Sequence, residues 1–75
     1  MTAVDRVTRE LDGARATFPA FNSAHEGWAV LREEVDELWE EVKQRQPDRE
    51  RMRKEATQVA AMAIRFLHDV CGVPL

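Results

Sequence analysis

The stretch LREEVDELWEEVKQ, residues 31–44, sets acidic side chains between large apolar ones at regular intervals. Its apolar residues recur at steps of four, three and four, as Leu31, Val35, Leu38 and Val42. That spacing places side chains along one side of an α-helix. The stretch therefore predicts an amphipathic helix whose acidic residues lie beside, and opposite, an apolar stripe.

A second apolar stripe follows closely in the chain. Its members recur with the same helical spacing: Met52, Ala56, Val59, Ala63, Phe66 and Val70. No part of the sequence alternates with the two-residue period of a β-strand, so we expect an all-α protein. Because only a short turn separates the two stripes, the two helices are predicted to form an antiparallel hairpin.

Capping residues predict where these helices begin. Ser23 is followed three residues later by Glu26, the arrangement of a capping box, so the second helix of the chain is expected to start there and to run to about residue 45. Pro47 and Asp48 suit the first turn of the next helix, which we expect to end near residue 71.

The size of the chain predicts self-association. Its 75 residues support one domain at most, with a short first helix over residues 3–13 that Gly13 would stop. One hairpin covers only one side of each apolar stripe. We therefore expect two hairpins to form a four-helix bundle in a homodimer or homotetramer, with Trp39 in the core or in the interface.

Composition excludes several classes of partner. The 11 basic and 14 acidic residues give a net charge of -3 without a basic stripe, so binding to a nucleic acid polymer is not expected. No apolar run approaches the roughly 18 residues of a membrane span, and the N-terminus is charged, so we expect a cytoplasmic protein without a membrane partner. The single cysteine, Cys71, cannot form an internal disulfide.

Some of the carboxylates lie beside the stripes rather than opposite them. On a wheel of about 100° per residue, Glu34 and Glu37 flank the first stripe, and Glu55 and Gln58 flank the second at corresponding angles. The hairpin is thus predicted to bring three carboxylates and an amide together. Like charges repel unless a cation is present or a proton is retained, and such oxygen ligands suit Mg²⁺ or Mn²⁺.

A simpler interpretation of the same carboxylates is a solvated acidic face. Acidic residues are common on exposed helices, where they form ion pairs with basic residues three or four positions away or on a neighbouring helix. The basic residues placed to do so are Arg32, Lys43, Arg53 and Lys54.

The segments HEGWAVLREEVDELWEEVK and RMRKEATQVAAMAIRFLHDV resemble the MazG-like branch of the all-α nucleoside triphosphate pyrophosphohydrolases. The resemblance extends from Phe21 to Val70 within a single domain, residues 1–75. That family has a Glu-Glu-x-x-Glu motif on one helix and a Glu-x-x-Asp motif on the next. The first motif is complete here, but the second ends in an amide where the family has a carboxylate; the matching residues are Glu33, Glu34 and Glu37, then Glu55 and Gln58.

The resemblance implies Mg²⁺-dependent hydrolysis of a nucleoside or deoxynucleoside triphosphate to the monophosphate and pyrophosphate. It implies that Glu34, Glu37 and Glu55 hold Mg²⁺, with Mn²⁺ as a substitute and Gln58 as a weaker ligand. Glu33 would complete the catalytic set by orienting water. The alternative is a non-catalytic MazG-like module for oligomerisation or nucleotide binding, because Gln58 replaces the family's Asp.

Other residues are candidates for binding the substrate. His25 and Trp28 lie near the start of the second helix, where a base would stack on the indole; alternatively, Trp28 packs against the first helix and His25 caps the second or lies on the surface. Arg65 is placed to reach phosphates or to pair with an acidic residue of a neighbouring helix. We expect His68 and Asp69 on the surface.

Overall fold

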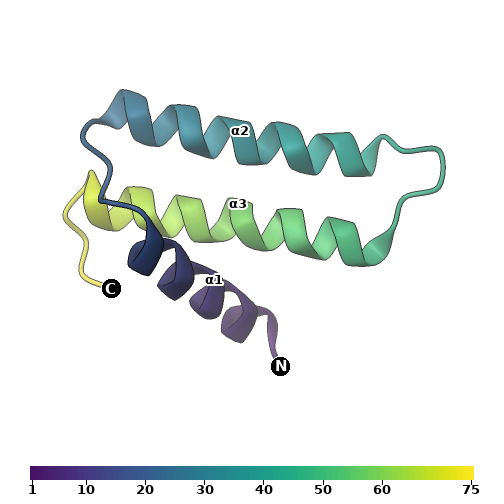
Figure 1. Ribbon diagram of the computed structural model, residues 1–75, viewed down its shortest axis with the longest axis horizontal. Helices are drawn as coiled ribbons and strands as arrows, with labels where there is room; N and C mark the ends of the chain where they lie inside the picture. Colours follow the sequence, from purple (N-terminus) through teal and green to yellow (C-terminus); the bar gives the residue numbers. More distant parts are fainter.

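The computed structural model describes all 75 residues. The chain forms three α-helices and no strand: α1 (Ala3–Thr17), α2 (Ala24–Val42) and α3 (Arg49–Asp69). Helices α2 and α3 lie side by side and antiparallel, and α1 packs obliquely against α3 (Figure 1). The predicted all-α hairpin with an additional N-terminal helix is thereby confirmed. None of the three helices combines the length and the apolar character that crossing a membrane requires.

The first helix begins at a capping box and is longer than expected. The Thr2 hydroxyl accepts a hydrogen bond from the Asp5 amide, and the Asp5 carboxylate accepts one from the Thr2 amide, both at 3.1 Å. The prediction that Gly13 stops the helix is wrong, because α1 continues to Thr17. A glycine inside a helix costs only about 1 kcal/mol, which packing against α3 offsets. The following Pro19 lies beyond the helix end.

The predicted starts of α2 and α3 agree with the structure. The Ser23 side chain accepts from the Glu26 amide at 3.1 Å, while the Glu26 carboxylate turns to the backbone amide of Asn22 at 3.3 Å. Asp48 accepts from two amides in the first turn of α3, at 2.8 and 3.2 Å. After α3, Gly72 takes a left-handed conformation, φ +72°, which favours glycine and turns the chain away from the helix axis.

The buried core lies where α1 and the α1–α2 connection meet α3, not along the two predicted stripes. Its apolar residues are Leu11, Phe21, Ala61 and Met62. No member of either stripe is fully buried, and Val35 and Val42 remain 42% and 43% exposed. Leu31, Phe66 and Val70 of the stripes pack against this core, while the rest of each stripe stays partly exposed, as expected of a single hairpin. The third helix adds a core on a different side of α3.

A glycine sets the close approach of α2 to α3. A Cβ atom at Gly27 would lie 2.7 Å from the Phe66 ring and 3.1 Å from the Phe21 ring. The 2.7 Å contact is shorter than real Cβ atoms show, so a larger residue would displace the Phe66 ring or α2 itself. Gly27 thus holds the two helices at the separation that lets side chains of one reach those of the other.

Buried charges fasten the α1–α2 connection to α3. Arg65 is only 4% exposed and donates to the Pro19 carbonyl oxygen at 2.8 Å, with its guanidinium 4.3 Å from the centre of the Phe21 ring. Its Nε lies 3.8 Å from the carboxylate of Asp69, which accepts from the Phe21 amide at 3.1 Å. Asp69, expected on the surface, has a side chain only 7% exposed, because this network satisfies it.

Candidate metal centre

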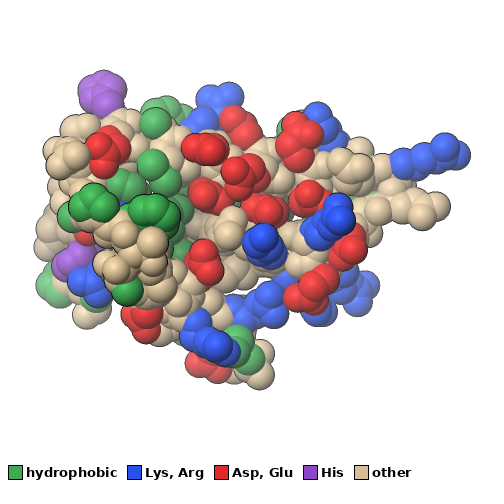
Figure 2. All heavy atoms as spheres, in the orientation of Figure 1, with side chains coloured by type: hydrophobic (Ala, Val, Ile, Leu, Met, Phe, Trp, Pro, Cys, Tyr) green, Lys and Arg blue, Asp and Glu red, His purple; other side chains and the backbone are tan.

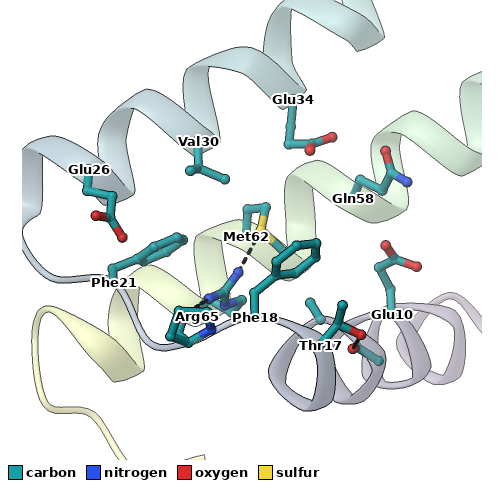
Figure 3. A pocket seen from close by; sticks show the side chains of 13 residues that line it. Glu10, Thr17, Phe18, Phe21, Glu26, Val30, Glu34, Gln58, Met62 and Arg65 are labelled. Atoms are coloured by element: carbon teal, nitrogen blue, oxygen red, sulfur yellow. Dashed lines mark hydrogen bonds between the residues drawn. The ribbon is translucent and has the colours of Figure 1, made fainter.

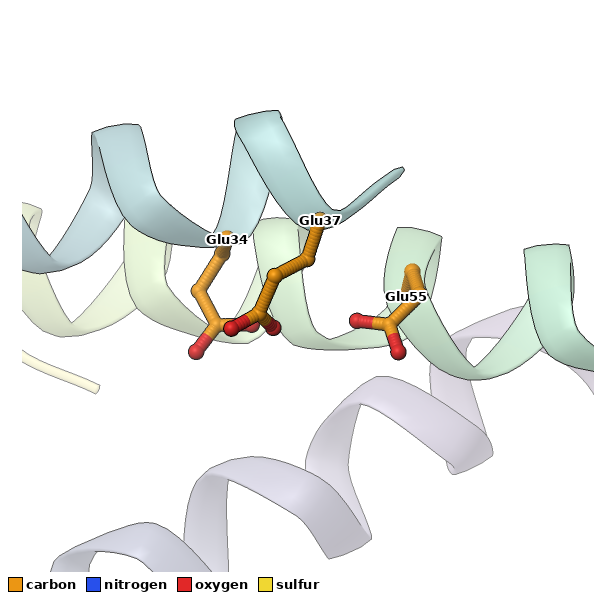
Figure 4. A group of neighbouring side chains, drawn as sticks. All are labelled: Glu34, Glu37 and Glu55. Atoms are coloured by element: carbon orange, nitrogen blue, oxygen red, sulfur yellow. The ribbon is translucent and has the colours of Figure 1, made fainter. Parts of the chain in front are cut away.

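Three carboxylates from two helices meet on one side of the hairpin (Figure 4). Glu34 and Glu37 extend from α2 and Glu55 extends from α3, and one ligand oxygen from each lies within 4.8 Å of the others. All three side chains are half-buried. We call these three residues the carboxylate cluster. Its members are the residues that helical spacing placed beside the stripes.

The charges of the cluster oppose one another. Burial raises the pKa of Glu34 from 4.5 to about 7, and repulsion from Glu37 and Glu55 adds to this effect. Burial also raises the pKa of Glu55, with Glu37 raising it further and Lys54 lowering it. A nearby positive charge would stabilise the ionised form of Glu34 and lower its pKa. A pKa near neutrality therefore shows that the negative charge of this carboxylate is not compensated. Near pH 7 the cluster therefore retains protons or attracts a cation.

Gln58 occupies the corner between the two helices. With its amide nitrogen facing the cluster, it donates to Glu34 Oε2 and to Glu55 Oε2, each at 3.0 Å. The opposite orientation would set the amide oxygen against two carboxylate oxygens, so the hydrogen-bond partners assign the first orientation. In this arrangement Gln58 is a donor to the carboxylates; it would become a metal ligand only by turning its amide over.

Of the four basic residues expected near the cluster, Arg32, Lys43 and Arg53 pair with other acids, and Lys54 forms no ion pair. None of the five ion pairs in the chain includes Glu34, Glu37 or Glu55. The solvated-face interpretation therefore holds for the neighbouring carboxylates but leaves the cluster without an ion-pair partner. The exposed pairs that it does describe are Arg32–Asp36 at 3.1 Å, Lys43–Glu40 at 2.9 Å and Arg53–Glu50 at 2.9 Å.

A cavity of about 620 Å³ opens beside the cluster, between α1, the α1–α2 connection and the hairpin (Figure 3). Glu34 and Gln58 form part of its wall, so the cavity and the cluster are continuous. The remaining wall is mixed, with Glu10, Thr17, Glu26 and Arg65 among apolar side chains. The large apolar residues are Phe18, Phe21, Val30 and Met62. The cavity suits a ligand with a flat, weakly polar part next to a group that binds a cation.

A shallower hollow of about 450 Å³ lies between α1 and α3, lined in part by Arg6, Arg9, Lys54 and Thr57. Glu10 lines both hollows, so these basic residues adjoin the cavity. In the space-filling view, blue side chains stand beside a group of red ones on this face of the molecule (Figure 2). Sequence reasoning missed the basic residues of α1, because helical spacing alone does not say where a third helix packs.

The remaining candidate residues are not all brought to the cluster. His25 and Trp28 are exposed and do not line the cavity, and Trp28 does not pack against α1, which contacts only α3. Arg65 lines the cavity, but the connection and Asp69 engage its guanidinium. Glu33 is exposed next to the cluster and contributes to raising the pKa of Glu34.

One further carboxylate was missed. Glu41 is half-buried, its Oε1 is buried without a hydrogen-bond partner, and its charge contributes to raising the pKa of Glu55. The available signal was its position seven residues after Glu34, which places both on the same side of α2.

Comparison with known protein families, with curated proteins and with solved structures finds no match to this chain.

Proposed function

We propose that this chain is a MazG-like, Mg²⁺-dependent nucleoside triphosphate pyrophosphohydrolase. It would convert a ribo- or deoxyribonucleoside triphosphate and water to the monophosphate and pyrophosphate. The observation that carries the proposal is the carboxylate cluster, whose oxygens lie within 4.8 Å of one another at the edge of a cavity large enough for a nucleoside. The Glu-Glu-x-x-Glu sequence around Glu34 supports the same assignment.

The cluster fits a small divalent cation. Glu34, Glu37 and Glu55 supply the negatively charged oxygen ligands that Mg²⁺ prefers, and Mn²⁺ accepts the same donors. The raised pKa of Glu34 supports a cation site, because no positive charge of the protein compensates this carboxylate. When bound there, Mg²⁺ would neutralise phosphate charge and make an attacking water more acidic. Gln58 would add a fourth, neutral ligand once its amide oxygen faces the cluster.

Residues around the cluster have separate parts in this proposal. Phe18, which is 60% exposed at the cavity wall, would stack on the base, and the buried Phe21 would hold the connection in place behind it. Arg9 and Lys54 would bind the phosphates in the adjoining hollow. Glu33, exposed beside the cluster, would accept a hydrogen bond from water and orient it toward the α-phosphate.

The proposed active form is a homodimer or homotetramer with a four-helix bundle. The half-exposed stripes support it, because a single chain leaves them without a covering layer.

A second candidate function is a non-catalytic helical module for oligomerisation or nucleotide binding. The observation that favours it is the pair of hydrogen bonds from Gln58 to Glu34 and Glu55. These bonds offset part of the repulsion between the two carboxylates without a metal ion.

A screen of the common ribo- and deoxyribonucleoside triphosphates tests the proposal. Each is incubated with Mg²⁺ and, separately, with Mn²⁺, and both products are measured. We expect pyrophosphate and monophosphate in equal amounts, and their loss in Glu37→Gln. Release of orthophosphate would place the cleavage at a different bond. Binding of triphosphates without any turnover would favour the second candidate.

A further inference from the structure

A buried arginine in the cavity wall has hydrogen-bond donors without an oxygen acceptor. Arg65 lines the cavity although its side chain is only 4% exposed. Its Nη2 donates to the Pro19 carbonyl oxygen at 2.8 Å, but Nη1 has only the thioether sulfur of Met62, at 3.6 Å, and Nε has no hydrogen-bond partner. Sulfur is a weak acceptor. Burying donors without acceptors is unfavourable, so this arrangement indicates a ligand that supplies an acceptor.

Arg65 lies toward the end of the cavity that is remote from the carboxylate cluster. Gln58, Met62 and Arg65 line the cavity from one side of α3, in the direction away from the cluster (Figure 3). Arg65 follows Gln58 by seven residues, which is about two turns or roughly 10 Å along the helix. A nucleotide whose phosphates bind the metal at the cluster would extend its base toward Arg65. The edge of the base farthest from the sugar would then meet the guanidinium.

The charge balance at Arg65 favours an uncharged acceptor. The guanidinium already faces the carboxylate of Asp69, with Nε 3.8 Å from Oδ2, and the Asp69 side chain is 7% exposed. These opposite charges compensate each other, so an anionic group of the ligand would bring an uncompensated charge into a buried site. A carbonyl oxygen would accept a hydrogen bond from Nη1 without that cost. The missing partner is therefore expected to be a neutral oxygen on the base.

The acidic residues of the wall do not favour an amino group at the same place. The two carboxylate oxygens of Glu26 accept from the backbone amide and the side-chain amide of Asn22, at 3.3 and 3.1 Å. Glu10 borders the basic hollow, where the phosphates are proposed to bind. An amino group turned toward Arg65 would set donor against donor. Guanine and thymine present an oxygen at this edge, whereas adenine and cytosine present an amino group.

We propose that Arg65 makes the cavity selective for nucleotides whose base carries an exocyclic oxygen at its outer edge, on C6 of a purine or C4 of a pyrimidine. Arg65 Nη1 donates to this oxygen, and bases with an amino group there bind more weakly. This inference rests on the proposed function, because that function places a nucleotide in the cavity.

Two purine nucleotides that differ only in the ring around C6 test the proposal in the unmodified protein. Inosine triphosphate has the oxygen, and purine riboside triphosphate has hydrogen in its place. Both carry a methylene group between the α- and β-phosphates, so neither is cleaved. In the presence of Mg²⁺, titration calorimetry should show at least about 10-fold tighter binding of the inosine analogue. Equal affinities, or tighter binding of the purine riboside analogue, would overturn the proposal and leave the proposed function intact.

A double variant assigns the preference to Arg65. Arg65→Met combined with Asp69→Asn removes both buried charges, because one charge left alone would destabilise the fold. The two affinities should then agree within about 2-fold, with binding of the purine riboside analogue unchanged. A purely structural role of Arg65 would instead weaken binding of both analogues alike. Arg15→Met, the same change at an exposed arginine outside this cavity, should keep the preference.

Circular dichroism checks that the variants are folded. If the double variant does not fold, the comparison of the two analogues in the unmodified protein decides the matter. A preference that persists in the folded double variant would overturn the proposal. If neither analogue nor any common triphosphate binds, the proposed function fails, and this inference fails with it.

Discussion

The two sides of α2 contrast sharply in chemistry. One side holds Glu34 and Glu37 against Glu55 of α3, and the other exposes the apolar side chains of Trp28, Val35, Trp39 and Val42. Crowded, partly desolvated carboxylates and apolar side chains in water are both unfavourable in an isolated chain, for opposite physical reasons. The core of the chain lies elsewhere, between α1 and α3. The comparison teaches that the single chain leaves each side of α2 unsatisfied in a different way: repulsion between carboxylates on one side, apolar side chains in water on the other.

Removing one carboxylate should affect the charged side most strongly. Glu37→Gln keeps the shape of the side chain but removes a charged ligand, so Mg²⁺-dependent release of pyrophosphate should fall by at least about 100-fold. The rise in melting temperature caused by Mg²⁺ should disappear, because a ligand stabilises only the state that binds it. Glu40→Gln, the same change on an exposed residue paired with Lys43, should leave both properties intact.

If Glu34→Gln, Glu37→Gln and Glu55→Gln combined in one chain leave stabilisation by Mg²⁺ unchanged, the cation binds somewhere else on the protein.

Adding a carboxylate at position 58 should increase the negative charge of the cluster and its affinity for a cation. Gln58→Asp removes the two donated hydrogen bonds and places a fourth charge at the corner, so the melting temperature without metal should fall. Affinity for Mg²⁺ in the absence of nucleotide should rise by at least about 10-fold, as measured by titration calorimetry. Turnover should rise as well if the site is catalytic. Gln46→Asp, in the exposed α2–α3 turn, provides the matched control.

If metal affinity and pyrophosphate release are both unchanged in Gln58→Asp, Gln58 does not occupy the fourth ligand position. Tighter metal binding without hydrolysis would favour the non-catalytic module.

The charged side should also make stability depend on pH. The pKa of Glu34 is about 7 in the folded chain against 4.5 for an unperturbed glutamate, so the folded state binds this proton more tightly than the unfolded state does. Its stabilising contribution is complete below pH 4.5 and is lost as the pH rises to about 7. Without divalent cations, the melting temperature should therefore fall by a few degrees over that interval.

Two measurements separate this effect from general charge repulsion. Glu34→Gln should flatten the decrease, and excess Mg²⁺ should restore the melting temperature at pH 7. A decrease that persists unchanged in Glu34→Gln would assign it to other groups.

The smallest effect on stability is expected from the Arg32–Asp36 ion pair, which lies at the surface between the two sides of α2. Both side chains are about 60% exposed, so water screens the pair. Arg32→Gln should change the free energy of unfolding by less than about 0.5 kcal/mol, as measured by urea denaturation, without altering metal binding. A larger loss would mean that α2 depends on its surface charges.

The carboxylate cluster was predictable because helical spacing alone fixes which side of a helix a residue occupies. Glu34 and Glu37 needed only the spacing of their own helix, and Glu55 needed only an antiparallel partner. The starts of α2 and α3 were predictable for a similar local reason, since Ser23 and Asp48 act through amides two or three residues away.

The core was not predictable from the same spacing. The stripe that includes Val35 has the pattern of a buried helix face, yet burial depends on which surface the third helix covers. The burial of Arg65 and Asp69 was not predicted, because charged residues are rarely buried unless they are paired. Arg65 pairs within its own helix rather than with a neighbouring one, and its other partner is the backbone oxygen of Pro19, which no side-chain pattern reveals. The continuation of α1 past Gly13 likewise depends on tertiary packing.

The way α1 is attached determines where the protein opens locally. This helix packs against α3 and not against α2, and Leu11 is its one fully buried residue, while Arg65 holds the following connection in place. Its backbone amides should therefore exchange with deuterium sooner than those of α3, through local opening that leaves the hairpin folded. A ligand seated in the cavity would touch α1 and the hairpin together, so it should slow that exchange selectively. Local opening of α1 about the anchored α1–α2 connection would then control access of a ligand to the cavity.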